Sequence, residues 1–151
     1  MRNVFKLCLM ILGMMVALGA TAAACTTISS DAIRQNRSAG VTRAYDRSPD
    51  EVYEAGLQAV KSLAAGGVWS GLEVTHSSPS EHEILAEQRL DSSVVPGVGV
   101  KNGLGIFVAP TPDGASDVTV VTMAADQFPG SAGTTVDSYR NAETYVFPAI
   151  D

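Results

Sequence analysis

The spacing of apolar residues between positions 48 and 67 predicts an amphipathic helix. Apolar side chains recur there every three or four residues, which places them on one face of a helix. Ser48 is a good N-cap, and Glu51 three residues later completes the pattern of a capping box. Gly66 and Gly67 are expected to end the helix. The positions predicted to face the core are Val52, Ala55, Gly56, Ala59, Val60 and Leu63.

Outside this helix the apolar positions favour a period of two, which is typical of strands. We expect strands over 41–45, 68–76, 83–90, 104–109 and 117–125. Turn-forming residues fill the segments 77–81, 110–116 and 126–133. Because these connections are short, neighbouring strands after the helix should pair antiparallel. A second helix is expected over 134–147, ended by Pro148.

The predicted order of elements is β-α-β-β-β-β-α. This order indicates an α+β fold, with an antiparallel sheet of four to five strands and two helices on one face. All of these elements fall within residues 41–151, which we interpret as a single domain. The helix "DEVYEAGLQAVKSL" followed by a meander is similar to small bacterial lipoproteins of unknown function. That resemblance supplies no catalytic residues.

The first 24 residues follow the pattern of a secretory signal peptide. Arg2 and Lys6 precede an apolar run over 7–18, and small residues then lead to Cys25. We expect residues 1–24 to be cleaved. The alternative is an uncleaved membrane-spanning helix over 7–24, but the second half of that segment is Ala, Gly and Thr, which insert weakly.

The sequence "AAAC" at 22–25 resembles the lipobox of bacterial lipoproteins. The resemblance implies that Cys25 carries diacylglycerol on its sulfur, that cleavage falls before it, and that its amine is acylated, for example with palmitate. Thr26 is not the aspartate associated with inner-membrane retention, so the family rule favours the outer membrane, facing the periplasm. The alternative is ordinary cleavage after Ala22 or Ala24, which would leave a free thiol on a soluble periplasmic or secreted protein.

The segment after Cys25 is polar and has no sustained apolar period. We therefore interpret residues 25–40 as the lipidated N-terminus and a flexible tether. Cleavage would leave 127 of the 151 residues and remove Arg2 and Lys6, so that the net charge falls from −6 to −8. This charge disfavours nucleic acid as a partner.

Two histidines and two glutamates bracket the turn "HSSPSEHE". His76 and His82, with Glu81 and Glu83, would approach one another if their strands pair as a hairpin, and imidazoles with carboxylates bind transition metals. Histidines in an acidic surface turn are more often simply solvated. We therefore expect no metal ion, no other cofactor and no catalytic residue here.

Two further segments invite a functional interpretation. The glycine spacing in "GVGVKNG" at 97–103 is followed by a strand rather than a helix, which disfavours a phosphate-binding loop. Val98 and Val100 in the same loop either pack as a further short strand or contact a partner. Trp69 is either a core residue at the seam between helix and sheet or part of an exposed binding patch.

These patterns together favour a lipid-anchored cell-envelope protein with a non-enzymatic binding or scaffolding domain. Its expected partners are the membrane, through the lipid on Cys25, and other envelope proteins. A G-x-S-x-G nucleophile elbow is absent from the sequence. The alternatives are a periplasmic hydrolase or metalloenzyme that uses His76 and His82, and a soluble protein without an anchor.

Overall fold

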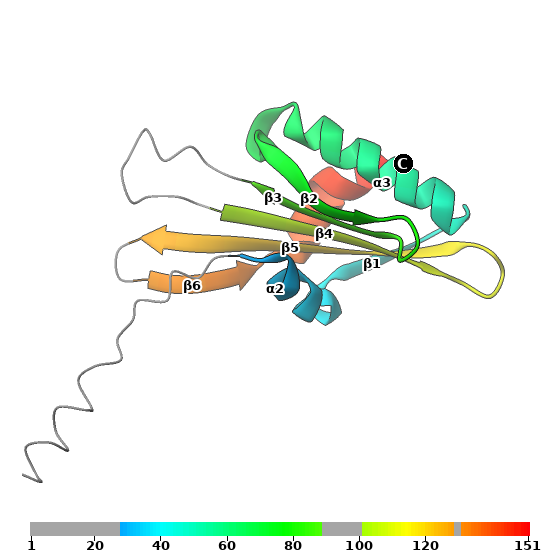
Figure 1. The fold of residues 1–151 in the computed structure, drawn as a ribbon, viewed down its shortest axis with the longest axis horizontal. Helices are drawn as coiled ribbons and strands as arrows, with labels where there is room; N and C mark the ends of the chain where they lie inside the picture. Colours follow the sequence, from blue (N-terminus) through cyan, green and yellow to red (C-terminus); the bar gives the residue numbers. More distant parts are fainter. Residues whose placement is uncertain (1–27, 89–100, 129–130) are drawn as a thin grey trace, which may run out of the picture.

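The computed structural model describes residues 28–88, 101–128 and 131–151 of the chain. Its strands and helices form layers around one antiparallel sheet (Figure 1). The strands are β1 (Val41–Tyr45), β2 (Leu72–Ser78), β3 (Glu83–Gln88), β4 (Lys101–Pro110), β5 (Ser116–Phe128) and β6 (Ser131–Val136). The helical segments are α2 (Ser30–Gln35), η1 (Arg37–Ala39), α3 (Pro49–Ala64), η2 (Gly67–Trp69), α4 (Ser138–Asn141), η3 (Ala142–Val146) and α5 (Phe147–Ile150).

The sheet is five strands wide, in the order β1-β5-β4-β3-β2, and every pairing is antiparallel. The sixth strand, β6, pairs with β5 as well. Since β1 pairs with residues 116–120 of β5 and β6 with residues 123–128, the two short strands follow one another along the same edge of β5. The predicted α+β class and antiparallel sheet are confirmed.

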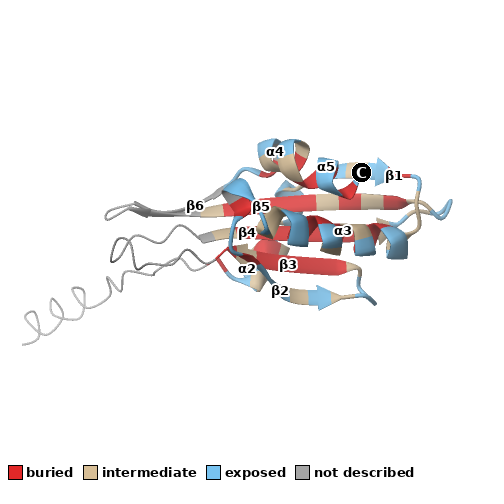
Figure 2. Ribbon diagram, turned by 90° about the horizontal axis from the view of Figure 1, so that it is seen from above, coloured by how far each residue is buried: buried red, intermediate tan, exposed pale blue. Residues whose placement is uncertain are grey.

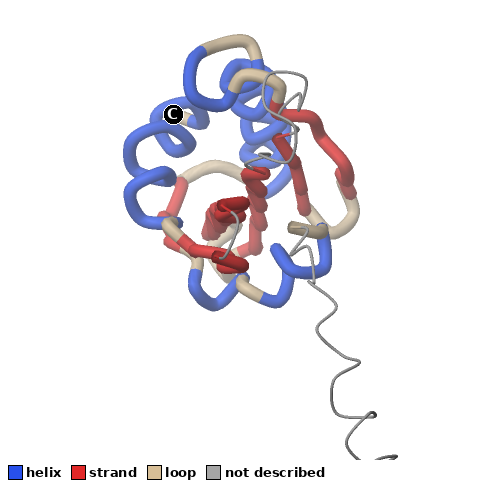
Figure 3. Tube along the Cα trace, turned by 90° about the vertical axis from the view of Figure 1, so that its left-hand side faces the viewer, coloured by secondary structure: helices blue, strands red, loops and turns tan. Residues whose placement is uncertain are grey.

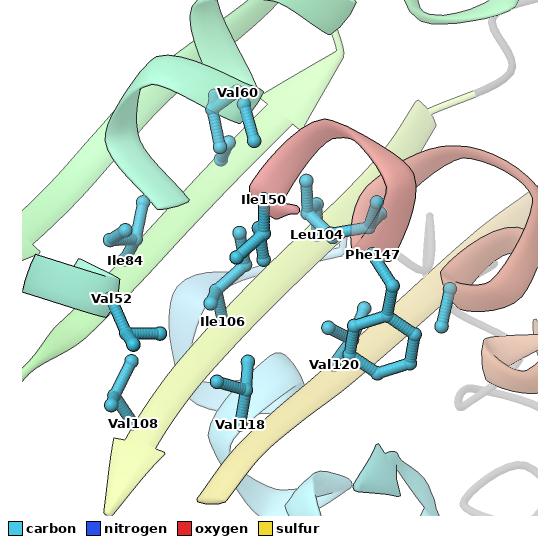
Figure 4. Close-up of a cluster of buried hydrophobic side chains, with 14 of the residues drawn as sticks. Val52, Val60, Ile84, Leu104, Ile106, Val108, Val118, Val120, Phe147 and Ile150 are labelled. Carbon is cyan, nitrogen blue, oxygen red and sulfur yellow. The ribbon is translucent and has the colours of Figure 1, made fainter. Parts of the chain in front are cut away.

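Helix α3 and the C-terminal helices cover one face of the sheet, as the sequence predicted (Figure 3). The capping box of Ser48 and Glu51 is formed. The core on this face unites Val52 and Val60 of α3 with Phe147 and Ile150 of α5 (Figure 4). The strand residues packed below them are Ile84, Ala86, Leu104, Ile106, Val108, Val118 and Val120. Buried residues therefore follow β3, β4 and β5, whereas much of edge strand β2 is exposed (Figure 2).

The C-terminal third differs from the prediction in two ways. Segment 126–133, expected to be a turn, instead belongs largely to strands, because β5 runs to Phe128 and β6 starts at Ser131. The second helix starts at Ser138 and does not end at Pro148, which lies in the first turn of α5. Proline is tolerated there because the first turn of a helix does not use that N–H group, and a π-helical stretch over Ala142–Val146 precedes it.

The other face of the sheet is covered by α2, and this corrects the prediction of a flexible tether over 25–40. Ile28 and Ile33 are 2% and 0% exposed. They pack in a second apolar cluster whose other buried members are Leu85, Phe107, Val121 and Met123. Residues 28–40 are therefore part of the folded domain. None of the helices in the described ranges is long and apolar enough to cross a bilayer.

Two glycines of β4 leave the space in which the side chains of Ile28 and Ile33 pack. A Cβ at Gly103 would lie 2.6 Å from Ile28 Cγ2, and a Cβ at Gly105 would lie 2.5 Å from Ile33 Cγ2. Real Cβ atoms essentially never approach a non-bonded heavy atom this closely. Only glycine at these two positions lets the isoleucines approach the backbone of β4 so closely.

Candidate functional site

A cluster of His76, Glu81 and Glu83 lies beside α2, on the face of the sheet that this helix covers only in part. The side chain of His76 reaches this face because the register between β2 and β3 shifts after Val74. Val74 pairs with Ala86, which belongs to the α3-side core, whereas His76 pairs with Leu85 of the opposite cluster. The bulge therefore turns His76 toward the same face as Glu83.

Hydrogen bonds from α2 fix the carboxylate of Glu83. Arg34 donates to Glu83 Oε1 from Nη2 at 2.6 Å and from Nε at 2.9 Å. Its Nη1 also bonds Asp31 at 3.1 Å. The bond to Glu83 is the largest influence that raises the pKa of the Arg34 guanidinium. The Glu83 side chain is only 12% exposed, so its position is well defined.

The imidazole of His76 has an unsatisfied nitrogen at the centre of this cluster. His76 Nε2 lies 3.5 Å from Glu83 Oε1. This nitrogen is shielded from solvent and forms no hydrogen bond. One ligand atom each from His76, Glu81 and Glu83 lie within 4.8 Å of one another. The cluster thus brings together a nitrogen and two carboxylates, the donor types that bind transition metals.

The second histidine serves a different part of the fold. His82 Nε2 lies 2.8 Å from Asp50 Oδ1, in the first turn of α3, and its ring meets the ring of Tyr53 edge-on at 6.0 Å between centroids. The backbone of His82 has a φ of 48°, in the left-handed region, and its carbonyl accepts from Val108 N. His82 therefore holds the β2–β3 turn against α3. It is not a member of the cluster around His76, so the described residues do not form the single site built from both histidines that the sequence analysis kept as an alternative.

A groove of about 550 Å³ opens between the α2–η1 segment and strands β1 and β5. It is lined by Arg34, Gln35, Arg37, Ser38, Gly40, Thr42 and Thr119. The guanidinium of Arg37 lies 4.8 Å from the centre of the Phe107 ring, and the hydroxyls of Thr42 and Thr119 bond at 2.9 Å. None of the described lining residues is acidic, although the chain carries a net charge of −6. The groove is therefore a polar surface that presents the guanidinium of Arg37, whereas the charge of Arg34 is paired with Glu83 and Asp31.

Sequence reasoning did not single out this groove. Its lining comes from both ends of the chain, since residues 34–42 meet Thr119 of β5. One signal was available: four of the ten basic residues of the chain are Arg34, Arg37, Arg43 and Arg47. Two of them, Arg34 and Arg43, form ion pairs with carboxylates, whereas the Arg37 side chain stacks on an aromatic ring.

The remaining candidate residues fall into two groups. Trp69 is 4% exposed and belongs to the α3-side core, so the core alternative holds and the exposed binding patch does not. Cys25, Val98 and Val100 lie outside the described residues. For catalysis, the only side-chain hydrogen bond of either histidine in the described part of the chain is that from His82 to Asp50. No serine or threonine hydroxyl there is paired with a histidine base.

No family model matches the sequence, and no curated protein is similar to it in sequence. Among solved structures, a crystal structure of a DUF4468 family protein from Bacteroides ovatus aligns with a TM-score of 0.36 and 11% identity. The alignment covers 66% of this chain and 60% of that chain. A likeness of this size carries no argument about function. The geometry itself defines the class of molecule as an α+β domain in which α3 and the C-terminal helices cover one face of the sheet and the short helix α2 packs on the other.

Proposed function

We propose that the protein is a lipid-anchored cell-envelope protein whose domain binds another envelope component without catalysis. The observation that carries the proposal is the position of Ile28, which is buried against the sheet only three residues after Cys25. Three residues span at most about 11 Å, at about 3.6 Å per residue. A lipid on Cys25 would therefore hold the folded domain directly at the bilayer surface.

A short link has a consequence for binding. Confinement to a surface raises the effective concentration of one membrane component near another, so that a small contact area is sufficient. The groove beside α2 suits such a role because it is open and polar and presents the guanidinium of Arg37. Arginine guanidiniums favour carboxylates and phosphates. The partner of the proposed function therefore presents an anionic group to this groove.

The anchor is tested by replacing Cys25 with serine in the full chain. Wild-type protein should appear in the membrane fraction, with a mass that equals the cleaved chain plus its acyl groups. Cys25→Ser should be released from the membrane or remain unprocessed. Cys8→Ser is the matched control, since Cys8 lies within the signal peptide and should leave with it. A Cys25→Ser protein that is processed and membrane-bound like the parent contradicts the anchor.

The groove is tested by a photo-crosslinking residue placed at Ser38, which is exposed on η1 and lines the groove. The same residue at Lys61, exposed on α3, is the control on the opposite side of the sheet. In native envelopes we expect a defined adduct from position 38 and none from 61, and Arg37→Ala should reduce the adduct. Equal adducts from both positions, or none from position 38, would remove the groove from the proposal.

A further inference from the structure

We propose that His76, Glu81 and Glu83 bind one divalent transition-metal cation, with zinc as the best chemical match. This site is separate from the proposed role of the groove and from the lipid anchor. It uses one histidine and two carboxylates from a single hairpin, together with Arg34 of α2. Imidazole with carboxylates favours Zn²⁺ and related metals, whereas Mg²⁺ and Ca²⁺ prefer sites made of oxygen alone.

The first argument is the unsatisfied nitrogen of His76. In a neutral imidazole one ring nitrogen carries a hydrogen and the other a lone pair. Nε2 is shielded from solvent and finds no hydrogen-bond partner, although a carboxylate oxygen lies 3.5 Å away. A lone pair facing a carboxylate is repelled by it, and buried polar atoms normally have partners. A cation between the two groups would satisfy both.

The second argument is distance. Zinc bonds to nitrogen and oxygen are about 2.0–2.2 Å long, which separates tetrahedral ligands by roughly 3.4 Å. The distance of 3.5 Å from His76 Nε2 to Glu83 Oε1 already matches this separation. All three ligand atoms lie within 4.8 Å, and Glu81 is exposed in the turn, so its side chain is free to move inward. Three protein ligands would leave one coordination position for water.

The third argument is the support given by Arg34. Its two bonds to Glu83 both end on Oε1, the same oxygen that lies 3.5 Å from His76 Nε2, so the guanidinium orients the carboxylate toward the imidazole. Such outer contacts are typical of metal sites. Arg34 also forms an ion pair with Asp31. Two carboxylates and one guanidinium therefore leave the cluster with a net negative charge before any cation binds.

The competing explanation is a protonated His76 that pairs directly with Glu83. The two explanations differ in what purified protein takes up. The full chain, purified in detergent without a histidine tag and stripped with a chelator, is titrated with zinc chloride by calorimetry. Cobalt chloride in a parallel titration reports tetrahedral coordination through its visible absorption. We expect one equivalent of metal per chain.

Variants locate the site. Loss of an outer contact usually weakens metal binding about 10–100-fold, so loss of a direct ligand in His76→Ala should weaken it at least about tenfold. Glu81→Gln should act in the same direction, and because Glu81 is exposed this variant is expected to fold even if His76→Ala does not. The matched control is Glu54→Gln, which makes the same change at an exposed carboxylate of α3, on the other side of the sheet, and should keep wild-type affinity.

Three outcomes would overturn the metal site. They are no uptake by wild-type protein, uptake of several equivalents that His76→Ala and Glu81→Gln leave unchanged, and equal loss of affinity in the control Glu54→Gln. The first of these would support the protonated pair. Because the titration is made on purified protein, its result does not depend on whether the lipid anchor or the groove behaves as proposed.

Discussion

Gly105→Ala tests whether α2 belongs to the folded domain. A Cβ at this position would lie 2.5 Å from Ile33 Cγ2 and 2.8 Å from Phe107 Cε2. Neither neighbour can yield easily, because Ile33 is fully buried and β-branched and Phe107 is buried beneath the guanidinium of Arg37. The added methyl group should therefore push α2 away from the sheet.

Two opposing effects set the magnitude of the change. Overpacking a well-filled core costs about 1–3 kcal/mol. Replacing glycine by alanine within a strand stabilises the folded state by about 0.5–1 kcal/mol, because alanine loses less backbone entropy on folding. The overpacking term is the larger, so the free energy of unfolding of Gly105→Ala should fall by about 1–2 kcal/mol. Gly66→Ala is the matched control, since a Cβ there meets nothing within 4 Å and its φ is −147°.

Two assays report the change. Urea denaturation measures the free energy of unfolding, and limited digestion with trypsin measures local release of α2, since Arg34 and Arg37 lie within this segment. In Gly105→Ala the bonds after Arg34 and Arg37 should be cut faster than in wild-type protein, whereas Gly66→Ala should be cut at the wild-type rate. If Gly105→Ala unfolds at the wild-type urea concentration and resists trypsin equally, the docking of α2 on β4 is refuted.

Three further predictions concern stability. Ser48→Ala removes the capping box of α3 and should lower the free energy of unfolding by about 1 kcal/mol, measured by urea denaturation. Arg43→Ala breaks an ion pair of 2.6 Å to Glu143 and a contact of 4.3 Å to the Phe147 ring, so it should cost about 1–2 kcal/mol. High salt should shrink that loss, and a loss independent of salt would argue against the ion pair. Burial of the phenol and the nearby negative charge of Asp151 raise the pKa of Tyr45 from 10.0 to about 12. The folded state therefore favours the neutral phenol, and stability that is complete below pH 10 should decline as pH rises to about 12. Tyr45→Phe should remove that decline, as measured by urea denaturation across this pH range.

The elements with a regular local pattern were predictable from sequence. Helix α3 combines a capping box with an uninterrupted apolar stripe, and both features are local to Pro49–Ala64. The central strands β3, β4 and β5 are rich in apolar residues, and the short turns between β2 and β3 and between β4 and β5 impose antiparallel pairing. These features depend on near neighbours in the chain, so the α+β class followed from them.

Helix α2 was not predictable because its partners lie far away in the sequence. Ile28 and Ile33 are five residues apart, which is not a helical repeat, and the segment between them is polar. Its stability in the fold comes from the space left by Gly103 and Gly105, some seventy residues further along the chain. A glycine in a strand indicates a close approach, but the sequence does not show what approaches.

The cluster around His76 was predictable in part. The hairpin that joins the histidine to Glu83 follows from the turn residues between them. The face on which His76 lies does not, because the bulge after Val74 reverses the alternation that the first half of β2 establishes. The position of the His82 side chain was not predictable either, because its left-handed backbone turns it toward Asp50 and away from the cluster.

Arg34 connects the three features on this side of the molecule, and this decides which variants are informative. It extends from α2, which follows closely on Cys25, it lines the groove, and it binds Glu83 of the cluster. A change at Arg34 would therefore disturb docking, groove and cluster together. Arg37 lines the groove without contacting the cluster, and Glu81 belongs to the cluster without lining the groove. If Arg37→Ala weakens only partner crosslinking and Glu81→Gln weakens only metal uptake, the groove and the cluster are two independent sites. If each variant impairs both measurements, the bound metal and the bound partner share one surface, and Arg34 is the residue through which they meet.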